Sequence, residues 1–177
     1  MRRAGEIAGL PVVVVDSGLV IGRVKELVFD FGHGRLAGFV VGGRDGVGYL
    51  PFDQVYSLGG TAVTVGVEAV FVPLDSVPAP VKRLLEARND SPRGRRVLTR
   101  TGRMLGRVED ILLDAESGAV WGYELTGGFI DDFINGRKAV PLTDEIVTGP
   151  DTLVVPDDGQ RHPAERHPTD GGGAGRR

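Results

Sequence analysis

The chain contains no cysteine among its 177 residues, which excludes disulfide bonds, thiolate metal sites and cysteine nucleophiles. A reducing compartment is therefore expected, and we predict a cytoplasmic protein. Histidine is scarce, because only His33, His162 and His167 are present, and none stands at the spacing of a metal-binding or catalytic motif. We accordingly expect no metal, no cofactor and no enzymatic activity.

Long hydrophobic runs are also absent. The longest, such as residues 11–15, fall far short of the roughly 20 apolar residues that a membrane-spanning helix needs. The basic start of the chain is interrupted by Glu6, Gly9 and Pro11, so we expect no signal peptide. A net charge of −3 argues against nucleic-acid binding by the chain as a whole. Peripheral association with a membrane stays open.

The most informative feature that is present is an internal repeat. Gly22-Arg23-Val24 recurs as Gly106-Arg107-Val108, an offset of 84 (106 − 22). Leu50-Pro51 recurs as Val140-Pro141 at an offset of 90 (141 − 51), so the second occurrence carries six extra residues (90 − 84). Such self-similarity predicts two homologous domains in tandem, which we call copy one and copy two.

Short clusters of Val, Leu and Ile, bounded by glycine or aspartate, predict an all-β fold for both copies. We expect strands near residues 10–15, 20–29, 35–41, 48–50, 62–65 and 69–71, and again near 96–100, 104–113, 119–125, 138–140 and 153–155. Good helix formers at 81–88, after Pro80, predict a short linker helix. The expected boundaries are 1–76 for copy one, 77–94 for the linker, 95–156 for copy two and 157–177 for a disordered tail.

An ordered set of glycines, charged residues and prolines occurs once in each copy. Its members are Gly18, Gly22, Arg23, Asp30, Gly38 and Pro51 in copy one, and Gly102, Gly106, Arg107, Asp114, Gly122 and Pro141 in copy two. The glycines stand where a hairpin turns and where a long strand must curl. Asp30 and Asp114 end that strand, and we expect each to bond the backbone of the following turn.

This set resembles the PRC-barrel family, and the two matches span most of residues 10–155. The resemblance implies two small, strongly bent β-barrels in tandem, with no family-wide set of catalytic residues. The family includes the cytoplasmic domain of the photosynthetic reaction centre H subunit and the C-terminal domain of the ribosome maturation factor RimM. This sequence shows no transmembrane helix like that of the H subunit and no additional domain like that of the maturation factor. Neither specific role is therefore carried over.

The extra residues of copy two form the first candidate site. They carry Phe129, Ile130, Phe133 and Ile134 at spacings that would line one side of a helical turn. One interpretation is that these side chains cap the barrel or fill the cleft between the copies. The other is a surface for a partner protein or for self-association, since loops normally expose polar residues.

The second candidate site is basic. Residues 91–108 contain no acidic residue, and they carry a series of arginines, Arg93, Arg95, Arg96, Arg100, Arg103 and Arg107. This segment is either a solvated basic face or a surface for an acidic protein, RNA or an anionic lipid. No aromatic residue interleaves, so base stacking is not supported. We expect a protein-binding or assembly module, and the alternative is an RNA- or ribosome-associated maturation factor.

Overall fold

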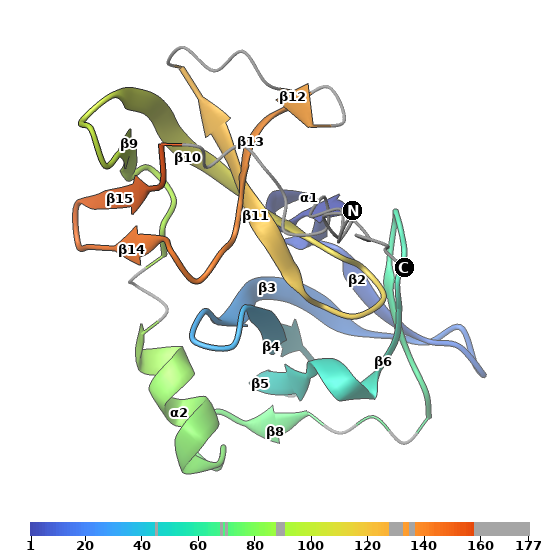
Figure 1. The fold of residues 1–177 in the computed structure, drawn as a ribbon. Coiled ribbons are helices and arrows are strands. Elements are labelled where there is room, and N and C mark those ends of the chain that lie inside the picture. Colours follow the sequence, from blue (N-terminus) through green and yellow to red (C-terminus); the bar gives the residue numbers. More distant parts are fainter. Residues whose placement is uncertain are drawn as a thin grey trace, which may run out of the picture.

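The computed structural model describes residues 1–44, 46–67, 69, 71–87, 91–127, 133–134 and 137–157. Two β-rich halves lie one above the other, with a helix at their side (Figure 1). The tail expected to be disordered falls beyond this description, apart from Asp157. No helix in the described part of the chain is long and apolar enough to cross a membrane.

Copy one forms a seven-stranded sheet in the order β6-β7-β2-β3-β4-β5-β8. Its elements are β2 (Pro11–Val14), β3 (Val20–Asp30), β4 (Arg35–Gly43), β5 (Gly46–Pro51), η1 (Phe52–Gln54), β6 (Val55–Leu58), β7 (Val63–Val65) and β8 (Val72–Pro73). The last strand begins at Val72 and not at 69–71, because Val72 is the residue that pairs with Tyr49 of β5. Strand β6 was not expected, since it buries only Leu58.

Copy two has the strand order β12-β13-β11-β10-β9-β15-β14, which repeats the pairing of copy one except at one edge, where β12 precedes β13 in the chain whereas β8 follows β7. Its strands are β9 (Arg96–Thr99), β10 (Met104–Leu113), β11 (Val120–Thr126), β12 (Phe133–Ile134), β13 (Arg137–Pro141), β14 (Val147–Thr148) and β15 (Thr152–Val155). In both copies the first strand pairs in parallel with the last long one, β2 with β7 and β9 with β15. The sequence repeat is therefore also a repeat of strand pairing, as predicted.

The first residues of the chain cross to the other copy. Strand β1 (Arg2–Arg3) pairs with β10, and α1 (Ala4–Ile7) follows it. The Arg3 guanidinium donates to the buried Glu124 carboxylate at 2.5 Å, and the Gly5 amide donates to Asp110 at 3.1 Å. We call residues 2–7 the N-terminal arm. It was not expected, because two strand residues and one helical turn leave no periodic pattern.

The linker helix is confirmed as α2 (Ala79–Glu86), with Pro80 in its first turn. Its buried Leu85 packs with Val28, Val40 and Tyr49 on one face of the copy-one sheet. Each such apolar side chain removed from water stabilises the fold by roughly 1.5–3 kcal/mol. The helix therefore belongs to copy one and shields one face of the copy-one sheet from solvent.

The two copies join through the turns of equivalent hairpins. The Leu36 amide donates to the Gly118 carbonyl at 2.8 Å, and the Val120 amide donates to the Gly34 carbonyl at 2.7 Å. These bonds are reciprocal, because Leu36 and Val120 differ by the repeat offset of 84 (120 − 36), as do Gly34 and Gly118 (118 − 34). Behind them, one continuous apolar core includes residues of both sheets. The copies therefore meet as a pseudo-dimer within one chain.

The recurring charged residues hold the backbone. The Arg23 guanidinium donates to the Gly9 carbonyl at 3.2 Å, and Arg107 donates to the Gly94 carbonyl at 3.0 Å. The turn bonds expected for the aspartates also form, since Asp30 accepts the amide of His33, and Asp114 accepts those of Glu116 and Ser117. The ordered set of the sequence is in these respects a folding signature.

Candidate binding site at the junction of the two copies

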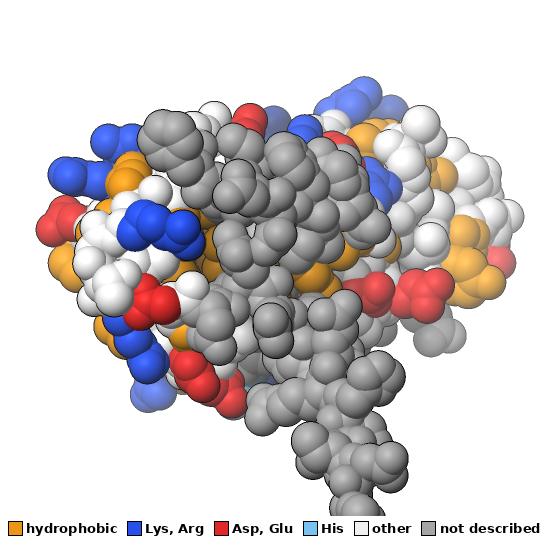
Figure 2. Space-filling view, turned by 45° about the horizontal axis from the view of Figure 1, so that its top comes forward, with side chains coloured by type: hydrophobic (Ala, Val, Ile, Leu, Met, Phe, Trp, Pro, Cys, Tyr) orange, Lys and Arg blue, Asp and Glu red, His pale blue; other side chains and the backbone are white. Residues whose placement is uncertain are grey.

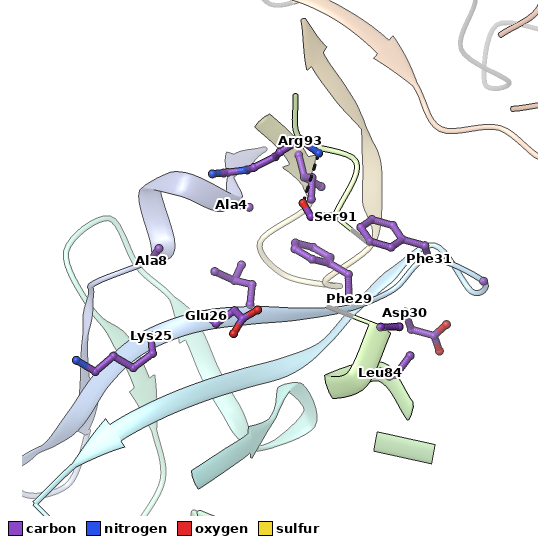
Figure 3. Close-up of a pocket in the computed structure, with 14 residues that line it drawn as sticks. Ala4, Ala8, Lys25, Glu26, Phe29, Asp30, Phe31, Leu84, Ser91 and Arg93 are labelled. Atoms are coloured by element: carbon purple, nitrogen blue, oxygen red, sulfur yellow. Dashed lines mark hydrogen bonds between the residues drawn. The ribbon is translucent and has the colours of Figure 1, made fainter. Parts of the chain in front are cut away.

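A hollow of about 440 Å³ lies where the N-terminal arm, β3, α2 and β10 come together (Figure 3). We call it the junction hollow. Its volume falls within the range of sites that hold small molecules or side chains of partners. Both copies and the linker contribute to its lining, so only the assembled pseudo-dimer forms it.

Aromatic and aliphatic side chains dominate this lining. The rings of Phe29 and Phe31 stack with their centroids 5.3 Å apart, and Figure 3 shows both on one side of the hollow. Leu84 of α2 and the buried Ile111 of β10 contribute further apolar surface. Phe31 itself is 37% exposed, which is unusual for a large ring beside a folded core. An apolar group that enters the hollow would meet a preformed aromatic wall.

The charged groups around the hollow are mostly paired within the protein. The Arg93 guanidinium forms an ion pair with Asp110, and the Asp30 carboxylate contacts His33 Nδ1 at 2.8 Å. Lys25, in contrast, makes no hydrogen bond or ion pair with any described residue, and its side chain is exposed at one end of the hollow (Figure 3). Among the described residues, the site thus combines an apolar wall with one cation, Lys25, that makes no ion pair.

Phe31 also borders two further hollows toward copy two, both lined by Tyr123. Burial raises the pKa of the Tyr123 phenol to about 12, so the phenol is neutral at physiological pH. No group of three or more metal-ligating side chains occurs among residues whose positions are described. The junction can therefore bind an apolar group, with Lys25 as a charged group at the rim of the hollow.

The arginine segment does not form one open basic patch. Besides the pair of Arg93 with Asp110, Arg95 donates to the Gly149 carbonyl at 2.7 Å, and Arg100 lies 3.9 Å from Glu145. Arg107 holds the Gly94 carbonyl. Of the candidates for an anionic partner, Arg96 and Arg103 are exposed, and their side chains make no hydrogen bond or ion pair with another described residue. The segment's role in binding an anion stays a prediction.

The insertion of copy two is described only in part. Phe129 and Ile130 lie outside the described residues, and of Phe133 and Ile134 the structure gives the backbone alone. The helical turn expected there is wrong for these two, because they form strand β12 and pair with Lys138 and Arg137. Whether the four side chains form a partner surface stays a prediction.

Sequence reasoning missed the junction hollow. The strand expected at residues 20–29 included Phe29 as an ordinary strand residue and ended before Phe31. Nothing in that pattern indicates that the N-terminal arm and α2 would pack around them.

The comparison with protein families agrees with the repeat. The family model of the PRC-barrel domain matches twice, at residues 1–75 and 86–161. The two matches cover most of the chain and follow the two sheets, so the expectation of two tandem barrels of this type is confirmed. A search of curated proteins finds no match.

Proposed function

This chain belongs to the PRC-barrel family, and from that premise we propose that it is a non-enzymatic module that binds another protein through the junction hollow. The family match covers both copies but names no partner and no reaction. The proposal therefore depends on the site. The single observation that carries it is the half-exposed Phe31 stacked on Phe29 at the edge of a preformed apolar hollow.

The chemistry of the hollow favours an apolar side chain of a partner over a small polar ligand. Aromatic anchors in desolvated pockets supply most of the free energy of protein–protein binding. Lys25, at the rim, would add an ion pair with an acidic residue beside the partner's apolar anchor. A segment with a bulky apolar residue next to Asp or Glu is the partner that fits.

The alternative, an RNA- or ribosome-associated factor, has less support. Arg93 and Arg100 lie within ion-pair distance of carboxylates of the same chain, and Arg95 holds a backbone carbonyl. Binding a phosphate backbone would require several free cations along one surface.

Affinity capture from native lysate tests the proposal with three immobilised proteins: the unaltered chain, Phe31→Asp and Tyr56→Asp. Tyr56 is the matched control, because it is 79% exposed on β6 and does not line the hollow. We expect at least one protein that the unaltered chain and Tyr56→Asp retain, and that Phe31→Asp loses. Retention should survive nuclease treatment.

Two outcomes would contradict the proposal. One is that Phe31→Asp captures the same proteins as the unaltered chain, which would show that the hollow does not bind them. The other is that nuclease and high salt release every captured protein, which would favour the RNA-associated alternative. Thermal melts of both variants verify that each is folded.

A further inference from the structure

A second apolar surface lies at the end of copy one where the β2–β3 hairpin projects. It consists of Val15, Leu19, Val20, Val47 and Val67, and we call it the apolar end. All five are at least 45% exposed, and Val67 reaches 73%. Figure 2 shows hydrophobic side chains at the right-hand end of the molecule, the side on which this hairpin projects in Figure 1.

Strand pairing brings these residues to one place. The Val14 amide donates to the Leu19 carbonyl at 2.9 Å, and the Val15 amide donates to the Val65 carbonyl at 3.0 Å, two residues before Val67. Val47 begins the neighbouring part of the sheet, since it pairs with Gly42 near the end of β4. The ends of four strands, β7, β2, β3 and β5, thus present aliphatic side chains to solvent.

Copy two shows that the fold does not need them. There the Thr99 amide donates to the Arg103 carbonyl at 2.9 Å, and the Arg100 amide donates to the Val155 carbonyl at 3.0 Å, the same two bonds as in copy one. This register pairs each apolar residue of copy one with a residue of copy two: Val15 with Arg100, Leu19 with Arg103, Val20 with Met104 and Val67 with Asp157. One barrel end is charged and the other is aliphatic, although the backbone is the same. Clustered aliphatic side chains on a surface indicate a contact site.

The charged residues beside the apolar end indicate which kind of partner would be complementary to it. Asp16 lies in the turn after β2, and Arg44 lies in the turn after β4, so the β3 end with Leu19 stands between them. Neither side chain makes an ion pair within the described part of the chain, and both are exposed. A two-fold axis that passes through the β3 end and stands perpendicular to the sheet would place Asp16 of each molecule opposite Arg44 of the other. The surface is therefore complementary to itself in both apolar character and charge.

We propose that the apolar end is a self-association surface that joins two copies of this chain in a two-fold dimer. In such a dimer the same patch serves both partners, so each apolar residue is used twice. The dimer would leave both junction hollows open, because each hollow is lined by residues 25–32, the arm and α2 and lies away from the β3 end that carries Leu19. This proposal does not depend on what the hollow binds.

Sedimentation equilibrium of the full chain, from low to high micromolar concentration, tests it. We expect a reversible dimer, and Leu19→Asp should raise the dissociation constant at least about tenfold, the equivalent of 1.4 kcal/mol. Leu19 is exposed in a turn, so the variant should melt as the unaltered chain does. Val147→Asp is the matched control, since Val147 is 62% exposed on β14 of copy two, and it should leave the dimer intact.

A charge exchange tests the two-fold arrangement. Asp16→Arg should weaken the dimer, and adding Arg44→Asp should restore it. A chain that stays monomeric throughout the concentration range, or a dimer that Leu19→Asp leaves unchanged, would overturn the proposal. If the double exchange is as weak as Asp16→Arg alone, Asp16 does not face Arg44 and the two-fold arrangement is wrong.

Discussion

The ring of Phe52 lies against Gly118, so that a Cβ added to Gly118 would stand 2.7 Å from the Phe52 Cε1 atom. Phe52 belongs to copy one and Gly118 to the β10–β11 turn of copy two. The contact occurs beside the reciprocal backbone bonds of the two turns. Close packing at this point of the pseudo-dimer interface therefore requires a residue without a Cβ at position 118. The equivalent turn of copy one has no such contact at Gly34.

We predict that Gly118→Ala destabilises the protein more than Gly34→Ala. Both glycines have left-handed φ angles, +71° and +61°, which cost an alanine about 1–2 kcal/mol. A methyl group on Gly34 would meet only Leu142, at an ordinary 3.5 Å, whereas on Gly118 it would overlap the Phe52 ring. That overlap should add about 1–3 kcal/mol. Urea unfolding of the two variants measures the difference, and equal losses would mean that Phe52 moves aside freely.

A second pair of glycines should tolerate no side chain at all. A Cβ on Gly38 would lie 2.4 Å from the Leu50 carbonyl oxygen, and one on Gly122 would lie 2.2 Å from the Val140 carbonyl oxygen. Because backbone cannot step aside as a side chain can, each alanine variant should lose about 3 kcal/mol or more of unfolding free energy. Gly66→Ala is the control, since nothing lies within 4 Å of its added Cβ. A near-neutral Gly122→Ala would show that β11 and β13 can separate without loss.

These glycines illustrate how far the sequence leads. Their recurrence at a fixed offset predicted the repeat, and the aliphatic runs between them predicted long strands such as β3 and β10, because each run carries its own local pattern. The junction hollow and the N-terminal arm depend on packing between residues far apart in sequence. Arg93 looked like part of a basic surface, because its partner Asp110 becomes a neighbour only after β10 folds back.

The loss of stability at acid pH should depend in part on Asp114. Hydrogen bonds from the Ser117 amide, and then from the Ser117 hydroxyl, lower the pKa of Asp114 below its ordinary value of 3.8. A lowered folded pKa stabilises the protein above the unfolded value, and this contribution is lost as pH falls through the folded pKa. Asp114→Asn keeps an acceptor oxygen but cannot titrate. The difference in melting temperature between the unaltered chain and this variant should therefore narrow as the pH falls below about 4. A gap that stays constant with pH would contradict the assignment.

The N-terminal arm should come loose when Asp110 is removed. The Asp110 carboxylate accepts the Gly5 amide at 3.1 Å and the Ile111 amide at 2.7 Å, and it pairs with Arg93, so Asp110→Ala leaves three donors without this acceptor. Because Arg93 is half-exposed and can turn to water, we expect a loss of about 2 kcal/mol, less than for a fully buried pair. Hydrogen exchange at amides 2–7 should accelerate more than exchange in β3, since local opening of the arm precedes global unfolding. Asp114→Asn serves as the control and should leave arm exchange unchanged, because the hydrogen bonds of the Asp114 side chain with described residues are to Glu116 and Ser117 of its own turn. Equal acceleration in the arm and in β3 would mean that Asp110 supports the whole fold and not the arm's attachment to copy two.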